Sequence, residues 1–345
     1  MDKVRYKHLN SYLKDKFGER TLKVCIDSGF TCPNRDGVKG CGGCIFCGSM
    51  GAGENIKYKI HNRQLITNGN TDIREDYACE NSKSVRELRW QDDIFLGGSN
   101  DIVNSIRNQV VMFLNSYRGE RAEKFIAYFQ SFTNTYADID SLRMCYDAGL
   151  NCSDKFVGLQ IATRPDCIDE EVVALLKSYK DKYYVCVELG LQTANDDIGR
   201  VINRGYTTLD FEKAVRLLHA SGIDVVVHIM VGLPNEKPKD VFETVELINR
   251  LNVNGVKIHS TYVQRETVLE KMYRRGAYSS ITQEYYVGMV GEIIKRLNRD
   301  IVIHRITADP PCNECVAPQW VMHKKVVLNS INRYLADNDI VQGMM

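Results

Sequence analysis

Most of the chain alternates between amphipathic stretches and short apolar runs. From about residue 100, stretches with apolar residues at helical spacing are each followed by a mostly continuous apolar run. We expect helices at 101–116, 139–148, 169–179, 209–220 and 241–250. We expect strands at 22–27, 124–130, 156–163, 183–192, 223–232 and 256–264. Because these strands are apolar throughout instead of alternating, they are typical of a parallel sheet that is covered on both faces.

Short strands that alternate with helices indicate repeated βα units, and the six strands predict an α/β protein built as a partial (β/α)6 barrel. We expect the barrel over 21–310, with a polar insertion at 57–98. The end of this region should hold an amphipathic helix at 286–297 and a short strand at 301–306. Residues 311–345 would then form a short C-terminal α/β extension with a terminal helix.

Residues 1–20 are basic and are expected to form a helix, because Tyr6, Leu9, Tyr12 and Leu13 fall near helical spacing. Two interpretations are open: a solvated helix that lies on the domain, or a basic arm that contacts RNA phosphates. The net charge of +1 argues against a strongly basic coat but does not exclude a local patch.

Composition indicates a cytoplasmic protein without a membrane span. The 44% hydrophobic content is enough for a sizeable core, and no run of about 18 apolar residues is long enough to cross a bilayer. The chain has 12 cysteines and lacks an apolar signal region after Met1. In a reducing cytosol such cysteines more often bind metal or serve catalysis than form disulfides.

Four cysteines lie close together among several glycines: Cys32, Cys41, Cys44 and Cys47. Thiolates are soft ligands that select zinc, copper(I) or iron–sulfur clusters. A structural zinc site usually has a second close pair downstream, and the only later pair, Cys312-x2-Cys315, is far away in the sequence. The pattern therefore favours an iron–sulfur cluster over zinc.

Two sets of three thiolates are candidate ligands. Cys41, Cys44 and Cys47 have the spacing of a ferredoxin-type run, but its fourth cysteine would be at position 51, which is glycine. The other set is Cys32, Cys44 and Cys47, which leaves one iron of a four-iron cluster without a protein thiolate. An open metal position is where chemistry takes place.

Residues 29–37 and 42–47 resemble a group of radical S-adenosylmethionine (SAM) proteins related to the catalytic subunit of Elongator, a wobble-uridine modification enzyme. The resemblance covers roughly residues 20–310. It is strongest to the bacterial single-domain relatives of Elongator, the MnmL-like family. Its further motifs are T-R-P-D at 163–166, E-L-G-x-Q at 188–192, N-R-G at 203–205 and H-x-M-x-G-L-P at 228–234.

The resemblance implies a radical SAM barrel in which Cys32, Cys44 and Cys47 bind a [4Fe-4S] cluster, with SAM chelating the open iron. Cys41 then stands where the family has a residue that is not a ligand. By the same resemblance, contacts with SAM are expected from Gln130, Thr133, Glu188, Gln192, Arg204 and Gly232. Taken singly, Glu188 is equally well explained by a salt bridge, and His228 by a hydrogen bond in the core.

The implied reaction is cleavage of SAM by the reduced cluster, followed by abstraction of a substrate hydrogen. The implied substrate is the tRNA wobble uridine, trimmed from carboxymethylaminomethyl-uridine to aminomethyl-uridine, and a protein such as flavodoxin or ferredoxin would supply electrons. Candidate RNA contacts are the N-terminal helix, Arg274-Arg275 and Lys324-Lys325. Two alternatives are a radical SAM enzyme for a small metabolite or porphyrin-like molecule, and a non-catalytic iron–sulfur sensor.

The chain departs from the Elongator pattern in two respects. We expect no acetyltransferase domain after the barrel, which puts acyl-CoA chemistry in doubt. The pair Cys312-x2-Cys315 also stands where the family has none, and it is open to three interpretations: a second metal site, a redox pair, or two thiols without a function.

Overall fold

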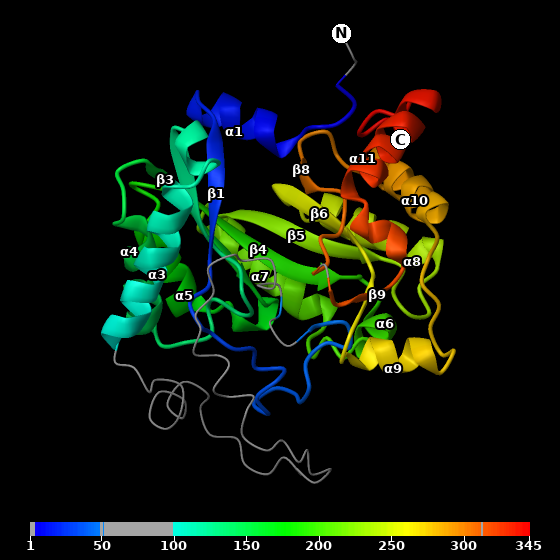
Figure 1. The fold of residues 1–345 in the computed structure, drawn as a ribbon, viewed down its shortest axis with the longest axis horizontal. Coiled ribbons are helices and arrows are strands. Elements are labelled where there is room, and N and C mark those ends of the chain that lie inside the picture. Colours follow the sequence, from blue (N-terminus) through cyan, green and yellow to red (C-terminus); the bar gives the residue numbers. More distant parts are fainter. Residues whose placement is uncertain (1–3, 49–50, 52–98, 312) are drawn as a thin grey trace.

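The centre of the computed structural model, which describes residues 4–48, 51, 99–311 and 313–345, is a parallel sheet of seven strands (Figure 1). In spatial order the strands are β1 (Thr21–Ile26), β2 (Lys124–Phe129), β3 (Phe156–Thr163), β4 (Tyr184–Gln192), β5 (Asp224–Val231), β6 (Gly255–Ser260) and β8 (Val302–Arg305). Each is parallel to its neighbours. The predicted partial barrel is confirmed, and the short strand expected at 301–306 joins it as the seventh. The insertion expected at 57–98 lies outside the described residues.

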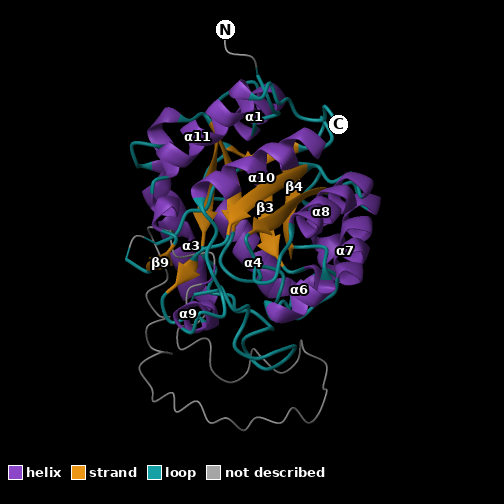
Figure 2. Cartoon of the chain, turned by 90° about the vertical axis from the view of Figure 1, so that its right-hand side faces the viewer, coloured by secondary structure: helices purple, strands orange, loops and turns teal. Residues whose placement is uncertain are grey.

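Amphipathic helices connect the strands and cover the outside of the sheet (Figure 2). They are α3 (Ser99–Leu114), α4 (Ile139–Leu150), α5 (Glu170–Ser178), α7 (Thr208–Ala220), α8 (Pro238–Arg250) and α10 (Gln283–Arg296). Outward-facing strand residues such as Val24, Phe129 and Val227 are fully buried in the main hydrophobic core. Asp169 and Thr207 begin their helices by accepting a hydrogen bond from a backbone N–H of the first turn.

The strand expected at 256–264 is wrong in its second half. Strand β6 ends at Ser260, and β7 (Val263–Gln264) pairs instead with β9 (Cys315–Ala317), antiparallel, in a small separate sheet. An apolar run shows that a segment is buried, but not which sheet it joins. Val263 packs with α9 (Val268–Arg274) and with Ile45 of the cysteine-rich segment in a second hydrophobic cluster.

The two ends of the described chain meet at the amino ends of the strands, opposite the cysteine-rich segment (Figure 1). The backbone N–H of Ile303 in β8 donates to Lys7 at 2.8 Å, just before α1 (Leu9–Phe17). Lys7 in turn donates its backbone N–H to the side chain of Gln342 at 2.9 Å, beyond α11 (Lys324–Asp337). Helix α1 therefore lies on the domain, which supports the first interpretation of the basic N-terminus. No helix in the described part of the chain is long and apolar enough to span a membrane.

Candidate active site

The cysteine loop, defined here as residues 28–48, follows β1 and lies at the carboxyl ends of the strands (Figure 1). Asn34 is fully buried in it, and its Nδ2 donates to the backbone oxygen of Asn203 at 2.6 Å. The side-chain amide of Asn203 donates back to the backbone oxygens of Cys41, at 3.1 Å, and Gly43, at 2.7 Å. Asn203 follows α6 (Asp196–Val201) and has a φ of 52°, a conformation that asparagine tolerates well. These bonds attach the loop to the segment after β4.

Three thiols of the loop are neighbours. Burial, together with the charges of Cys47 and, more weakly, Cys32, raises the pKa of Cys44 to about 12, so both of these thiols lie within electrostatic reach of Cys44. Cys41 is exposed instead. No group of three or more His, Cys, Asp or Glu within the described ranges already has the geometry of a metal site. The three thiols therefore lie together without forming a finished ligand cage.

Two guanidinium groups lie beside these thiols. Arg164, after β3, donates to both carboxylate oxygens of Asp166, at 2.9 and 3.0 Å, and its charge lowers the pKa of Cys44 against the larger effects of burial and Cys47. Arg35 donates to the backbone oxygen of Cys47 at 2.7 Å. Cationic groups at this position favour the thiolate forms, which are the forms that bind metal.

Several buried hydroxyl groups at this end of the barrel have no protein partner in the described part of the chain. They belong to residues that are at most 1% exposed and that follow β1, β2 and β6: Ser28, Ser131, Thr133 and Thr261. A buried polar atom without a partner costs about 1–3 kcal/mol, so such atoms indicate a bound molecule or water. Soft thiols next to unpaired hydroxyls fit an iron–sulfur cluster together with a polar cofactor.

Glu188 lies deeper, inside the barrel on β4, and its side chain is fully buried. Both of its carboxylate oxygens accept hydrogen bonds. The donors are Lys23 Nζ (3.2 Å) and Gln160 Nε2 (2.6 Å) at Oε1, and Lys257 Nζ (2.5 Å), His228 Nε2 (2.8 Å) and the Tyr128 hydroxyl at Oε2. Burial alone would raise the pKa of Glu188, but Lys257 and Lys23 hold it well below its ordinary value. Because five donors already surround this carboxylate, contact with SAM would require one of them to move, and that contact stays a prediction.

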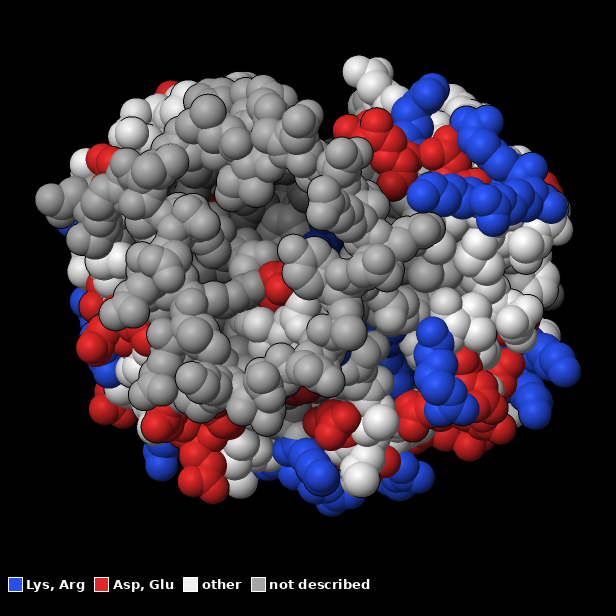
Figure 3. Space-filling model, turned by 90° about the horizontal axis from the view of Figure 1, so that it is seen from below, with Lys and Arg blue, Asp and Glu red and all other residues white. Residues whose placement is uncertain are grey.

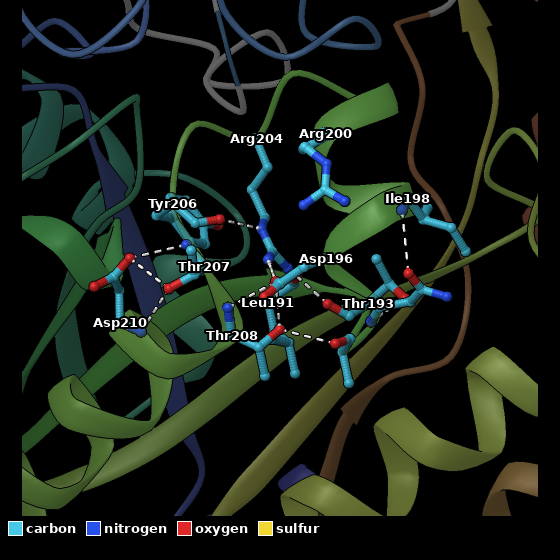
Figure 4. A network of polar contacts seen from close by, with 12 residues as sticks. Leu191, Thr193, Asp196, Ile198, Arg200, Arg204, Tyr206, Thr207, Thr208 and Asp210 are labelled. Atoms are coloured by element: carbon cyan, nitrogen blue, oxygen red, sulfur yellow. Dashed lines mark hydrogen bonds and ion pairs between the residues drawn. The ribbon is translucent and has the colours of Figure 1, made fainter.

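Arg204 is also buried, at 0% exposure. Its guanidinium donates to the Asp196 carboxylate (2.6 Å) and to the backbone oxygens of Leu191 (2.8 Å), Thr193 (2.6 Å) and Tyr206 (2.9 Å) (Figure 4). These bonds hold together the segment after β4 and account for the burial of the charge. Gln192, the last residue of β4, accepts from the Tyr206 hydroxyl at 2.9 Å. Contact of either side chain with SAM stays a prediction.

The other predicted SAM contacts lie at strand ends. Gln130 directly follows β2, and the backbone N–H of Thr133 donates to Thr31 in the cysteine loop at 3.2 Å. Gly232 follows β5 with a φ of 91°, and a Cβ there would lie 2.9 Å from the side chain of Ile281. The structure thus brings Thr133 to the loop and lines up Gln130, Gln192 and Gly232 along the mouth of the barrel, while Glu188 and Arg204 lie within the protein.

Sequence reasoning missed the polar residues that surround Glu188, above all Lys23, Gln160 and Lys257. Each lies in a strand that is otherwise mostly apolar. Lys257 is two residues from His259, whose pKa is also affected by the charge of Glu188, so both face the barrel interior. The sequence does contain a signal for this cluster: polar residues at alternate positions of otherwise apolar strands face the same side of the sheet.

Comparison with known proteins agrees with these features. Residues 39–248 match the radical SAM superfamily, and residues 253–337 match the radical SAM C-terminal domain. The chain is 33% identical over 339 residues to YtqA of Bacillus subtilis (strain 168), which covers 98% of this chain and 92% of YtqA.

Two further likenesses are partial. The chain is 31% identical over 159 residues to the tRNA uridine(34) acetyltransferase of Dehalococcoides mccartyi (strain CBDB1), covering 45% of this chain and 34% of that protein. The archaeal Elp3 of Methanocaldococcus infernus shares the fold with a TM-score of 0.58 at 21% identity, covering 70% of this chain and 60% of that one. The barrel, the thiol-rich loop at its mouth and a superfamily match over most of its length lead to one conclusion: the chain belongs to the radical SAM superfamily and is a radical SAM enzyme.

Proposed function

We propose that this radical SAM enzyme acts on the wobble uridine of tRNA and converts carboxymethylaminomethyl-uridine to aminomethyl-uridine. The observation that carries the substrate class is the 31% identity to an enzyme named for uridine 34 of tRNA. That likeness spans about a third of the other protein, so its acetyltransferase activity is not carried over. Anticodon bases are unpaired in a single-stranded loop and can be splayed out toward an enzyme, as specific recognition of RNA requires.

In this proposal Cys32, Cys44 and Cys47 hold a [4Fe-4S] cluster. The closeness of Cys44 to both other thiols, and the exposure of Cys41, support this set over Cys41, Cys44 and Cys47. When bound, the cluster and SAM supply a radical that abstracts a hydrogen atom from an unactivated C–H bond.

The chain's own residues would bind and orient the cluster and SAM and shield the radical from water. Arg164 and Arg35 offset the negative charge of the thiolates. The unpaired hydroxyl of Thr133 offers a hydrogen bond to SAM, and Gln130 and Gln192 lie at the carboxyl ends of β2 and β4. Because the barrel encloses the site and limits the access of water, a radical formed inside would be protected from side reactions.

A reducing protein such as flavodoxin or ferredoxin would deliver electrons at the cysteine loop. Val38, Lys39 and Cys41 are exposed there, so a partner can approach the thiols from the surface. Lys39 is bonded to Asp166, which also pairs with Arg164, so these three groups together carry one net positive charge.

The face that carries the cysteine loop has interspersed charges on its described surface (Figure 3). Of the predicted RNA contacts, Arg274 is bonded to Glu270 at 2.6 Å, and Lys324 to Asp309 at 3.3 Å. Arg275 directly follows α9 and is exposed. Arg275 is therefore the stronger candidate for a phosphate contact, and binding would depend more on the shape of the anticodon loop than on a basic coat.

The test is the nucleoside composition of tRNA from a strain that lacks this protein. We expect carboxymethylaminomethyl-uridine to accumulate and aminomethyl-uridine to disappear, as measured by mass spectrometry. Unchanged wobble nucleosides would refute the proposal. Formation of 5′-deoxyadenosine that responds to a small-molecule extract, and not to tRNA, would favour the alternative of a small metabolite or porphyrin-like substrate.

A further inference from the structure

Two buried ammonium groups share a single carboxylate inside the barrel. The Lys23 and Lys257 side chains are 15% and 7% exposed, and both form an ion pair with Glu188, whose side chain is 0% exposed. Two positive charges and one negative charge leave an excess of one positive charge. An unbalanced charge in a poorly solvated interior is costly, so proteins normally pair it with a group of opposite sign.

The positive character extends to β8. Arg305 is the register partner of Lys257. Burial, together with the charges of Lys23 and Arg305, lowers the pKa of Lys257 to about 8 against the opposing effect of Glu188. Arg305 forms no ion pair with the residues that the structure describes. A second carboxylate, that of Asp224 at the amino end of β5, interacts with Tyr184 instead. Apart from Glu188, the described part of the interior therefore has no negative charge that balances the second lysine.

The cluster also has unused hydrogen-bond donors. An ammonium group has three N–H bonds. Lys257 uses one for Glu188 and one for the Tyr128 hydroxyl, at 2.9 Å, and Lys23 uses one for Glu188 and approaches His304 Nδ1 at 3.4 Å. One N–H on each lysine is left for another acceptor.

The cluster is not sealed. The His228 side chain, which donates to Glu188 at 2.8 Å, is 25% exposed, and its ring lies 5.2 Å from that of His259. The buried Nε2 of His259 has no partner in the described part of the chain. A small polar group can therefore approach along the two histidines and find both a free nitrogen and the excess charge.

We infer that Lys23 and Lys257 bind a carboxylate group of the substrate beside Glu188. This inference rests on the proposed function, because the side chain of the proposed substrate ends in a carboxymethyl group and that of the product does not. A carboxylate carries the one negative charge that the two lysines and Glu188 lack, and it accepts hydrogen bonds from both ammonium groups. A slender side chain that carries it can enter the barrel, whereas the tRNA backbone would remain at the mouth.

The first test uses N-methylglycine, which carries the same carboxymethylamino group, as a probe of the cluster-loaded enzyme in the presence of SAM. We expect Lys257→Met and Lys23→Met to bind the carbon-13-labelled probe about tenfold more weakly in an NMR titration, the value of one lost charge-assisted bond. Glu188→Gln should bind it more tightly, because it removes the competing negative charge. Lys155→Met, at an exposed lysine that is paired with Glu123, is the matched control and should bind as the original chain does.

Equal affinity of all four variants for the probe would overturn the inference. So would a loss in Lys257→Met that Glu188→Gln reproduces, because that result indicates general disruption of the barrel.

The carboxylate of SAM is a second source of the same chemistry. We expect the affinity for SAM to change less than twofold in Lys257→Met. An equal loss of SAM and probe binding would assign the lysines to SAM and overturn the assignment to the substrate.

Failure of the proposed function can be distinguished from failure of the carboxylate site. Probe binding that depends on the lysines, together with unchanged tRNA in the deletion strain, would retain the carboxylate site and reject tRNA as the substrate. Altered tRNA in the deletion strain, together with probe binding that is unchanged in the lysine variants, would retain tRNA as the substrate and reject the carboxylate site.

Discussion

Asn34 and Asn203, which lie 169 positions apart, hold the cysteine loop by hydrogen bonds in both directions. The Asn34 amide donates to the Asn203 backbone, and the Asn203 amide donates to the backbone of the loop at Cys41 and Gly43. The thiols therefore take their position from the segment after β4 as well as from their own glycine-rich chain. The space is tight, because a Cβ on Gly205 would lie 2.7 Å from the Asn34 side-chain oxygen.

Asn203→Ala should loosen the cysteine loop without unfolding the barrel. It removes two hydrogen bonds and places alanine at a positive φ, which together cost about 2–4 kcal/mol. We expect faster loss of iron to a chelator, followed by absorbance, with little change in the far-UV circular dichroism. Asn10→Ala, at an exposed position in α1, is the control, and equal rates of iron loss in the two variants would contradict the role of Asn203.

Single cysteine substitutions separate the two candidate ligand sets. Cys32→Ala, Cys44→Ala and Cys47→Ala should each lose most of the iron and the SAM-dependent change in the EPR spectrum of the reduced protein, because a cluster held by three thiolates tolerates the loss of none. Cys41→Ala should keep both. If Cys32→Ala kept its cluster and Cys41→Ala lost it, the ligands would be the other set.

Arg204→Met should destabilise the protein strongly. It removes the side-chain donor of the Thr193 backbone oxygen, one of two donors of the Leu191 backbone oxygen and the partner of Asp196, at a cost of about 3 kcal/mol. Arg200→Met is a matched control on α6, the short helix just before Arg204, because that side chain is 74% exposed and its pairing with Asp197 contributes little (Figure 4). Denaturant unfolding measures both free energies, and similar losses in the two variants would refute the structural role of Arg204.

His304 should make the barrel less stable in mild acid. Burial, aided by the charge of Lys23, lowers the pKa of His304 well below its ordinary value. The unfolded chain therefore binds a proton below about pH 6.5 and the folded chain does not, so stability falls as the pH decreases, by up to about 1.4 kcal/mol per pH unit.

His304→Gln removes this proton-linked loss. Between pH 7.5 and 5.5 its free energy of unfolding, measured with urea, should fall less than that of the original chain. Equal decreases in the two proteins would show that His304 does not contribute.

The strands of the barrel could be predicted because they are continuous apolar runs between glycines and charges. Residues 156–163, for example, form the expected strand without a shift. The small sheet of β7 and β9 could not be predicted, because its strands of two and three residues carry no periodicity. Helix α9 was missed because its seven residues are too few for a clear apolar stripe.

Within the site, spacing alone predicted the thiols as metal ligands, because the residues lie on one loop. The bonds between Asn34 and Asn203, and the donors that surround Glu188, come from distant strands and depend on how the sheet closes. A motif at a strand end predicted Glu188 as a contact with SAM, but it could not reveal that Lys23 and Lys257 already bind that carboxylate.

The joining of residues 5–8 to β8 and to Gln342 has a consequence for biosynthesis. The amino-terminal segment leaves the ribosome first, yet its partners Ile303 and Gln342 are made about 300 residues later. During translation the early strands therefore form βα units before this segment has its partners. For that time the outer edge of the growing sheet has no strand beside it, which is the state in which nascent chains pair with one another. Chaperone capture should accordingly concentrate on nascent chains that have not yet reached β8.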